Sequence, residues 1–350
     1  MKNRSMRVDD VTIDDASKCF VIAEIGHNHQ GNVETAKKMI QSAFNAGASA
    51  AKLQKRSNKS LFTQAYYDRP YNSENSFGDT YGQHREFLEF NRDQYLELQE
   101  YSEQLGIIFF ATAFDFESAD FLEDLGVPAF KVASGDLKNI PLIKYLASFG
   151  KPLFVSTGGG TIEDVDRVVE ELDSTKAPFC IMQCTMGYPP AWDELNLSVI
   201  SKFRDRYPNP VIGFSSHDNG IAMPVAAYAL GARVVEKHFT LNRTLKGTDH
   251  AFSLEPQGMS KLVRDLNRLH TALGDGNKRQ FDSEIDPGQK MGKKMVAARS
   301  LSPGDVLAST DILFKSPGDG LPPWMIDQFV GKRVKRALVF EQTLTKEDVD

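Results

Sequence analysis

Short hydrophobic runs alternate with amphipathic stretches from residue 20 to about residue 273. Eight of these runs have the length and the β-branched and aromatic content of strands. They are nearly continuous in apolar residues, which is typical of parallel strands buried on both faces. The predicted strands are residues 19–25, 49–54, 107–112, 128–134, 152–157, 178–184, 210–215 and 232–238.

Helix signals separate the predicted strands. Asn32 is a suitable N-cap for a helix whose apolar stripe extends to Phe44. Thr161 and Asp164 are spaced as a capping pair for a second helix, with Ile162 on its apolar stripe. Eight alternating strand and helix units predict an α/β fold of the (β/α)8 (TIM) barrel type. The alternative, an open doubly wound sheet, is disfavoured because no G-x-G-x-x-G motif follows the first strand.

Two segments depart from the regular repeat. Residues 55–92 are polar, aromatic and long for a connection, and such a loop at the mouth of a barrel is often functional. Residues 274–292 are polar and rich in glycine, as expected of a linker. The sequence therefore predicts a barrel over residues 1–273, a linker, and a small β-rich domain over residues 293–350, with strand-like pieces that include 332–338.

Composition narrows the class of protein. The 41 basic and 47 acidic residues give a net charge of −6, so we expect neither nucleic acid nor an anionic membrane as a partner. No apolar run approaches the roughly 18 residues of a membrane span, and the first residues do not resemble a secretory signal. Three cysteines are too few for a disulfide framework, which favours the cytoplasm. Two of them, Cys180 and Cys184, are expected to pack in the core.

Polar residues cluster at the ends of the predicted strands, where barrel enzymes carry their active sites. Lys52 and Lys131 lie inside apolar strands, where an unpaired ammonium is very unfavourable. An ion pair with Glu24 or Glu236 would account for one such lysine. Two lysines on one rim, together with serine hydroxyls, instead indicate a binding site for phosphate or carboxylate. The serines are Ser134, Ser156 and Ser215.

Two histidines end the last two strands. His217 and His238 are neighbours in a closed barrel, where adjacent strands lie about 4.8 Å apart, so their imidazoles could share one metal ion. Glu24 lies beside them across the barrel closure. The other histidines considered, His27, His84, His250 and His270, show no such pairing, and for them a structural role is expected.

These strand-end residues belong to motifs that resemble those of the sialic acid synthase family. The motifs are Glu24 to Gly31 (EIGHNHQG), Lys52-Leu53-Gln54, Phe130 to Gly135 (FKVASG), Ser156-Thr157-Gly158, Cys184-Thr185 with Tyr188-Pro189, Ser215-Ser216-His217 and Lys237 to Thr240 (KHFT). Residues 293–350 resemble the antifreeze-like (SAF) domain that ends such synthases, with Pro317-Gly318-Asp319-Gly320 and Gly331-Lys332 at the expected places. The resemblance covers nearly the whole chain.

The resemblance implies a condensation of phosphoenolpyruvate with an open-chain acetamido sugar, N-acetylmannosamine or a related hexose. Carbon 3 of phosphoenolpyruvate attacks the sugar aldehyde, water adds at carbon 2, and phosphate leaves by C–O cleavage. The product is a nine-carbon, sialic-acid-like 2-keto acid. A domain-swapped homodimer, in which each SAF domain covers the barrel mouth of its partner, is also implied.

The resemblance assigns roles to individual residues. A divalent cation, manganese in preference to magnesium, would bind His217 and His238 and act as a Lewis acid. Glu24 would be the acid and base. Phosphoenolpyruvate would be held by Lys52, Thr112, Lys131, Ser134, Ser156, Ser215 and Lys293 or its neighbour Lys294. The sugar would contact Gln54, Asp136, Tyr188 and Asp249.

Three positions depart from the family pattern. Met186 stands in place of an asparagine, Ser316 in place of an arginine, and Asp136 in place of a glutamate. The reaction class is thus expected to be kept, while the acceptor need not be N-acetylmannosamine. One alternative is a related 2-keto-3-deoxy sugar acid synthase acting on a shorter sugar phosphate, with Arg56 and Arg69 binding the second phosphate. The other is a non-catalytic sugar-binding relative.

Overall fold

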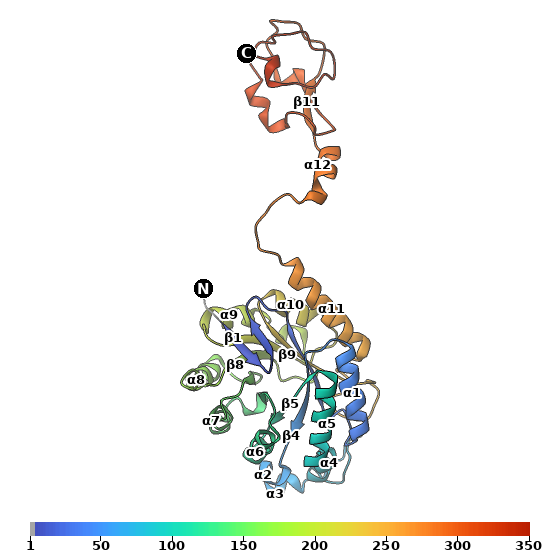
Figure 1. Cartoon of the computed structure of the whole chain (residues 1–350), viewed down its shortest axis with the longest axis vertical. Coiled ribbons are helices and arrows are strands. Elements are labelled where there is room, and N and C mark those ends of the chain that lie inside the picture. Colours follow the sequence, from blue (N-terminus) through green and yellow to red (C-terminus); the bar gives the residue numbers. More distant parts are fainter. Residues whose placement is uncertain (1–3) are drawn as a thin grey trace. The chain divides into compact units, whose positions relative to one another are not determined.

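The computed structural model describes residues 4–350 and divides into two compact units, Met1–Gly274 and Asp275–Asp350. In the first unit, eight parallel strands close into a barrel in the order β10-β3-β4-β5-β6-β7-β8-β9 (Figure 1). The strands are β3 (Phe20–Gly26), β4 (Ala50–Lys55), β5 (Ile108–Ala113), β6 (Phe130–Val132), β7 (Leu153–Ser156), β8 (Phe179–Cys184), β9 (Val211–Ser216) and β10 (Val234–His238). All eight predicted strands and the (β/α)8 barrel are confirmed.

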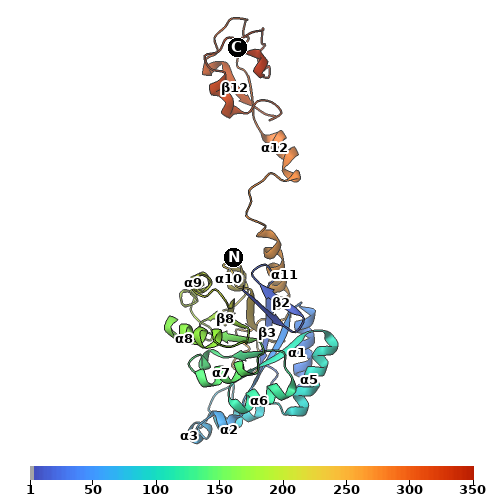
Figure 2. The same ribbon diagram turned by 60° about the vertical axis from the view of Figure 1, so that its left-hand side comes forward.

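Helices surround the strands on the outside of the barrel, as the two ribbon views show (Figures 1 and 2). They are α1 (Val33–Asn45), α5 (Arg92–Leu105), α6 (Phe116–Leu125), α7 (Ile140–Ser148), α8 (Ile162–Asp173), α9 (Ser198–Arg206), α10 (Ala222–Ala229) and α11 (Pro256–Ala272). The predicted caps form: the Asn32 side chain accepts the Thr35 N–H at 2.8 Å, and the Asp164 carboxylate accepts the Thr161 N–H at 3.0 Å. The apolar stripes also predict that Phe44 and Ile162 are buried. This prediction is wrong, because both lie at the margin of their stripes and are 39% exposed.

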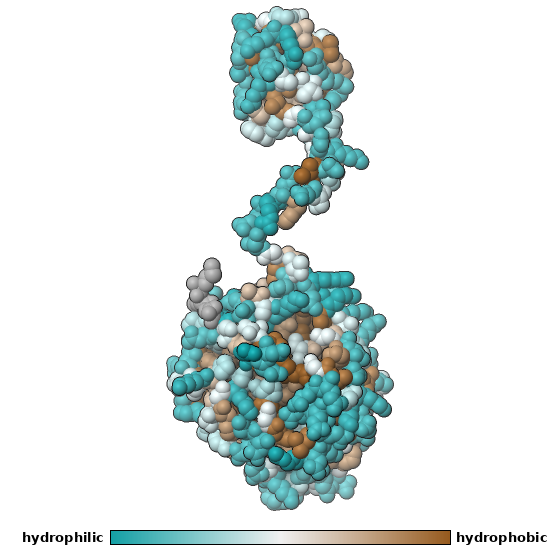
Figure 3. Space-filling model, in the orientation of Figure 1, coloured by the Kyte–Doolittle hydropathy of each residue, from teal (hydrophilic) through white to brown (hydrophobic). Residues whose placement is uncertain are grey.

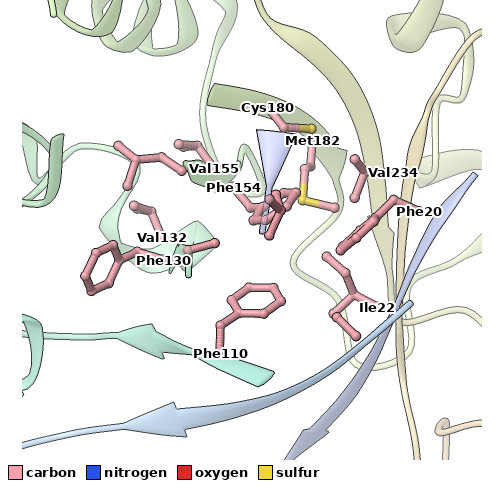
Figure 4. Close-up of a cluster of buried hydrophobic side chains, with 14 of the residues drawn as sticks. Phe20, Ile22, Phe110, Phe130, Val132, Phe154, Val155, Cys180, Met182 and Val234 are labelled. Carbon is pink, nitrogen blue, oxygen red and sulfur yellow. The ribbon is translucent and has the colours of Figure 1, made fainter. Parts of the chain in front are cut away.

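The barrel interior near the start of the strands is filled by large apolar side chains (Figure 4). The Phe154 ring stacks on Phe20 at 5.9 Å and on Phe110 at 5.4 Å between centroids. This packing leaves the polar residues at the opposite, C-terminal ends of the strands. On the face of this unit seen in Figure 3, hydrophilic side chains predominate. Among residues 4–350, no helix has both the length and the apolar character needed to cross a membrane.

A short hairpin precedes the barrel. Its antiparallel strands are β1 (Ser5–Val8) and β2 (Val11–Asp14). Met6, Val8 and Ile13 of the hairpin are buried in the barrel core. The hydrophobic pattern does not predict this hairpin, because each strand is only four residues long and at least half of its residues are exposed or polar.

The long connection over residues 55–92 folds into three short helices, α2 (Asn58–Leu61), α3 (Gln64–Tyr67) and α4 (Tyr81–Leu88). The ring of Tyr81 lies 4.8–5.4 Å from those of Phe62, Tyr66 and Tyr71, measured between centroids. This aromatic cluster gives the connection a core of its own, so its polar side chains have defined positions.

The second unit is small and irregular. Its strands β11 (Lys294–Ala297) and β12 (Ile312–Lys315) are antiparallel, and the predicted strand at 332–338 is wrong because those residues form only isolated bridges. Within the predicted linker lie η3 (Asp282–Glu284) and α12 (Ile285–Met291), and residues 275–291 are exposed. The remaining 3-10 helices of the chain are η1 (Ser134–Asp136), η2 (Trp192–Glu194), η4 (Ser309–Asp311), η5 (Pro323–Gln328) and η6 (Lys346–Asp348). The buried core of the unit is Met295, Ala297, Leu301, Leu307, Ile312, Met325, Phe329, Val334, Leu338, Leu344 and Val349.

Candidate active site

A cavity of about 470 Å³ opens at the C-terminal ends of the barrel strands. Twelve of the site residues predicted from the sequence line it, and they come from every strand or from the loop that follows it. They are Glu24, Lys52, Gln54, Thr112, Lys131, Ser134, Ser156, Tyr188, Ser215, His217, His238 and Asp249. Side chains that are distant in sequence thus share one polar cavity above the apolar core.

Two buried lysines and two buried glutamates form a network at the base of this cavity. Lys52 Nζ lies 2.6 Å from Glu24 Oε2 and donates to Thr112 Oγ1 at 2.8 Å. Glu236 lies between the lysines, 3.8 Å from Lys52 Nζ and 4.0 Å from Lys131 Nζ. Glu24 and Glu236, considered as alternative partners of a lysine, both form ion pairs, and the lysines are not left as uncompensated charges.

The two glutamates of the network differ in their tendency to ionise. Burial raises the pKa of Glu24 to about 7, despite the opposing effect of the Lys52 ammonium. Burial would likewise raise the pKa of Glu236, but the charges of Lys131 and Lys52 outweigh it and the pKa is lowered. Glu236 is therefore a permanent counterion near neutral pH, whereas Glu24 can gain and lose a proton there.

Hydroxyl groups and backbone amides line the neighbouring wall. Lys131 Nζ donates to Ser156 Oγ at 2.6 Å, and Ser215 Oγ donates to Glu236 Oε1 at 3.1 Å. Ser134 Oγ accepts the Gly158 N–H at 3.1 Å, and a Cβ at position 158 would lie only 2.7 Å from that oxygen. This wall presents donors of the kind that bind phosphate or carboxylate oxygens.

The imidazoles of His217 and His238 face each other at the rim, with ring centroids 5.3 Å apart. His217 Nδ1 lies 3.1 Å from the Thr185 carbonyl oxygen, so a proton on Nδ1 leaves Nε2 free as a ligand. His238 Nδ1 is buried without a hydrogen-bond partner, 3.8 Å from Asp249 Oδ2. Burial lowers the pKa of both imidazoles, that of His217 to about 3, which keeps them in the neutral form that binds metals.

This donor set fits a divalent cation held by two protein ligands. Within residues 4–350, no group of three or more histidine, cysteine, aspartate or glutamate side chains is arranged to hold a metal ion. A cation on His217 and His238 would thus complete its coordination with water or substrate oxygens, an arrangement that leaves positions open for catalysis.

Two predicted site residues need separate description, one in the barrel unit and one in the second unit. Asp136 is part of η1, where its carboxylate accepts from Asn139 Nδ2 at 3.1 Å, and it is not among the lining residues. Lys293 belongs to the second unit, where its ammonium donates to the Met291 carbonyl oxygen at 3.0 Å. Contacts of these two residues with substrate stay predictions.

Several lining residues were not assigned to the leading hypothesis, and Arg56 was named only for the shorter sugar-phosphate alternative. Arg56 and Arg85 contribute two guanidinium groups, and the Met186 and Cys184 side chains also reach the wall. Arg56 directly follows β4, so its place at the rim could have been inferred from the strand register. Arg85 lies in α4, inside the long connection, where no hydrophobic period fixes which residues face the cavity. Cys180 packs in the core as expected, whereas Cys184, although buried, lines the cavity.

Comparison with protein families agrees with this geometry. Residues 39–278 match the NeuB family, and residues 295–350 match the SAF domain. The motif resemblance noted in the sequence is therefore confirmed for both parts of the chain.

Known proteins resemble the chain over nearly its full length. It is 42% identical to the human N-acetylneuraminate-9-phosphate synthase, covering 95% of this chain and 93% of that protein. It is 32% identical to the N,N'-diacetyllegionaminic acid synthase of Legionella pneumophila, covering 95% of each. It also superposes, with a TM-score of 0.72 and 32% identity, on the crystal structure of an N-acetylneuraminic acid (sialic acid) synthetase from Leptospira borgpetersenii in complex with citrate, covering 81% of this chain and 95% of that one.

Proposed function

Since the chain belongs to the NeuB family and is a phosphoenolpyruvate-dependent enzyme that forms carbon–carbon bonds, we propose that it joins phosphoenolpyruvate to the aldehyde of an open-chain acetamido hexose. The product is a nine-carbon 2-keto acid of the sialic acid type, released with inorganic phosphate. One observation carries the proposal: two buried ammonium groups, a carboxyl group with a pKa near neutrality and two neutral imidazoles converge in one cavity.

Phosphoenolpyruvate is placed at the base of the cavity, against the two lysines. Lys131 already has a hydroxyl partner in Ser156, so an incoming phosphate or carboxylate meets an ammonium and a hydroxyl held in position. Lys52 is fixed between Glu24 and Thr112, which places a second positive charge beside the first. Because these groups are oriented before the substrate binds, little reorganisation opposes binding of the anion.

Glu24 is assigned the proton transfers. As the new bond forms between carbon 3 of phosphoenolpyruvate and the aldehyde carbon, the aldehyde oxygen needs a proton, which protonated Glu24 can donate. Water then adds at carbon 2, and ionised Glu24 can accept the proton that the water loses. Phosphate leaves carbon 2 with its bridging oxygen and takes the proton of the new C2 hydroxyl as the ketone forms, so the carboxyl group ends the cycle as it began. A pKa of about 7 suits both steps.

We also propose that His217 and His238 hold a divalent cation, manganese in preference to magnesium. When bound, such a cation supplies Lewis-acid polarisation of the aldehyde oxygen. Support comes from the donor set of this chain: two neutral imidazoles at one rim, one of them with a buried nitrogen that has no other partner.

The names of the relatives differ in one respect. The human protein is named for a product that carries a phosphate group, whereas the Legionella protein is named for a product without one. The shorter sugar-phosphate alternative relied on Arg56 and Arg69, but Arg69 is exposed and is not among the residues that line the cavity. The hexose acceptor is therefore preferred. A non-catalytic relative is contradicted by the relatives, which are named as synthases.

A homodimer and a cytoplasmic location complete the proposal. The three cysteines are free thiols, which fits a reducing compartment. Equilibrium sedimentation of the full chain tests the dimer, and the mass of a monomer at micromolar concentration would contradict it.

The deciding experiment measures phosphate released from phosphoenolpyruvate, with mass spectrometry of the product. The panel contains 2-acetamido hexoses, with and without a 6-phosphate, plus manganese or magnesium. We expect release only when sugar, phosphoenolpyruvate and cation are all present, and a product that contains the six sugar carbons and three more. If no hexose supports release while arabinose 5-phosphate does, the shorter-sugar alternative replaces the proposal.

A further inference from the structure

Two arginines line the upper part of the cavity without forming an ion pair. Arg56 follows β4 and is 8% exposed, and Arg85 lies in α4. Within residues 4–350, neither guanidinium pairs with a carboxylate. The Glu89 carboxylate lies nearby, but its Oε2 accepts from Lys55 Nζ at 3.1 Å and from the Arg56 backbone N–H at 3.2 Å. A buried and a half-buried guanidinium with no carboxylate in direct contact are costly, and this is the arrangement of an anion site.

The imidazole of His27 separates the two guanidinium groups. Its Nε2 lies 3.1 Å from Arg56 Nη1, and its Nδ1 lies 3.2 Å from Arg85 Nη1. Burial, together with the two arginine charges, lowers the pKa of His27 well below its usual value, so the ring is neutral. A neutral imidazole has only one acceptor nitrogen, whereas guanidinium nitrogens are donors only. In one of the two contacts, an arginine N–H therefore faces the N–H of the imidazole, and the pair cannot form a hydrogen bond.

The position of Glu89 indicates which arginine lacks an acceptor. Glu89 Oε1 is buried without a hydrogen-bond partner and lies 3.6 Å from His27 Nε2. A proton on His27 Nε2 can therefore be directed at the Glu89 carboxylate. In that tautomer Nδ1 is unprotonated and accepts a hydrogen bond from Arg85. Arg56 Nη1 then has no acceptor among residues 4–350 and is available to a ligand in the cavity.

Aromatic groups hold both guanidiniums in place. Arg56 Cζ lies 3.7 Å from the centroid of the Phe114 ring, and Arg85 Nε and Nη2 donate to the Tyr81 hydroxyl at 3.0 and 2.8 Å. Such contacts orient the planar groups without neutralising their charge, which favours bidentate binding of a phosphate.

The position of Arg56 along β4 relates this site to the base of the cavity. Lys52, Gln54 and Arg56 are alternate residues, and Lys52 and Gln54 both line the cavity. Gln54 connects the two ends, because its Nε2 donates to Glu24 Oε1 at 2.6 Å and its Oε1 accepts from Arg56 Nη2 at 2.7 Å. At about 3.3 Å per residue, the Cα atoms of Lys52 and Arg56, which directly follows β4, stand about 13 Å apart. Glu24 and Gln54 thus lie between the two cationic groups, so a sugar whose aldehyde is at Glu24 can extend its carbon chain toward Arg56.

We propose that Arg56 and Arg85 bind a phosphate group on carbon 6 of the acceptor sugar, the carbon farthest from its aldehyde. The inference rests on the proposed function, because it places the aldehyde at Glu24 and phosphoenolpyruvate at the lysines. Carbon 6 of the acceptor becomes carbon 9 of the product, since condensation adds three carbons at the aldehyde end. The substrate is thus a 2-acetamido hexose 6-phosphate.

The test compares kcat/KM for N-acetylmannosamine and its 6-phosphate, with manganese and saturating phosphoenolpyruvate. We expect the wild type to prefer the phosphorylated sugar, and Arg56→Gln and Arg85→Gln each to lower the ratio of the two values by about 10- to 100-fold, as expected for a lost charged hydrogen bond. Arg85→Lys should recover part of this loss. The control is Arg69→Gln, since Arg69 is an exposed arginine of the same connection, and its ratio should equal that of the wild type.

The outcomes separate this inference from the proposed function. Turnover of both sugars with a ratio that neither Arg56→Gln nor Arg85→Gln changes would overturn the inference and leave the proposed function standing. If neither sugar is turned over, the proposed function fails, and calorimetry with the 6-phosphate on wild type and Arg56→Gln decides whether the anion site exists. Inorganic phosphate is the competing ligand. If it binds the arginines as tightly as the sugar phosphate does, the site belongs to the released phosphate and the inference is wrong.

Discussion

Glu24 shows how burial determines the chemistry of a single side chain. Its carboxyl group has a lysine and a glutamine as direct partners, yet removal from water dominates and holds the pKa at about 7. Glu236 shares the partner Lys52 with Glu24, and the ammonium groups of Lys52 and Lys131 keep it ionised. Similar carboxylates thus acquire different functions from their positions in one network, as counterion or as proton carrier.

Replacement of Glu24 by glutamine tests this assignment. We expect Glu24→Gln to lower kcat by about 10²- to 10⁴-fold, the usual contribution of a general acid and base. Because the first step needs the protonated carboxyl group, kcat/KM of the wild type should fall as the pH rises above about 7. Steady-state rates from pH 5.5 to 9 measure this decrease in kcat/KM, and a kcat/KM that does not change over that range would contradict the role of Glu24.

Metal binding can be measured separately from turnover. His217→Ala and His238→Ala should each abolish stoichiometric binding of Mn²⁺, observed by electron paramagnetic resonance, while the circular dichroism spectrum stays that of the folded wild type. His270→Ala is the control, because its imidazole contacts the Tyr228 hydroxyl away from the cavity. Unchanged Mn²⁺ binding in either of the first two variants would remove the metal assignment.

At the scale of elements, the sequence predicts best where the chain is buried on both sides. Every barrel strand was found because a buried parallel strand must be apolar almost throughout, and the strand ends then located Lys52, Lys131 and the two histidines. Arg85 was missed because its helix lies in a connection with no regular hydrophobic period. Its place in the cavity depends on packing around Tyr81, and no local signal in the sequence reports that packing.

The N-terminal hairpin provides a prediction at this scale. Ile13 is 1% exposed and packs in the barrel core, so Ile13→Ala should lower the free energy of unfolding of the barrel by about 2–5 kcal/mol. Val11→Ala, in the same strand but 36% exposed, should lower it by less than about 1 kcal/mol. Urea denaturation monitored by circular dichroism compares the two. Equal losses would mean that the hairpin does not pack as described.

At the scale of the whole molecule, the barrel and the SAF unit have separate hydrophobic cores, and the segment between them is exposed. Brief digestion with trypsin should therefore cut first after Lys278, Arg279 or Lys290, which lie in that segment. Mass spectrometry of the fragments identifies the cut. Earlier cleavage within residues 55–92 would show that this connection, despite its aromatic cluster, opens more readily than the segment between the units.

The residues on and just after β4 also bear on the length of the acceptor that the cavity can bind. Backbone geometry sets the spacing of the Lys52 and Arg56 Cα atoms, and contacts with Glu24 and Gln54 hold the two side chains. If Arg56 holds the phosphate, a sugar phosphate one carbon shorter than a hexose brings its aldehyde less close to Glu24. Discrimination among acceptors then follows from their length before any hydroxyl or acetamido group is recognised.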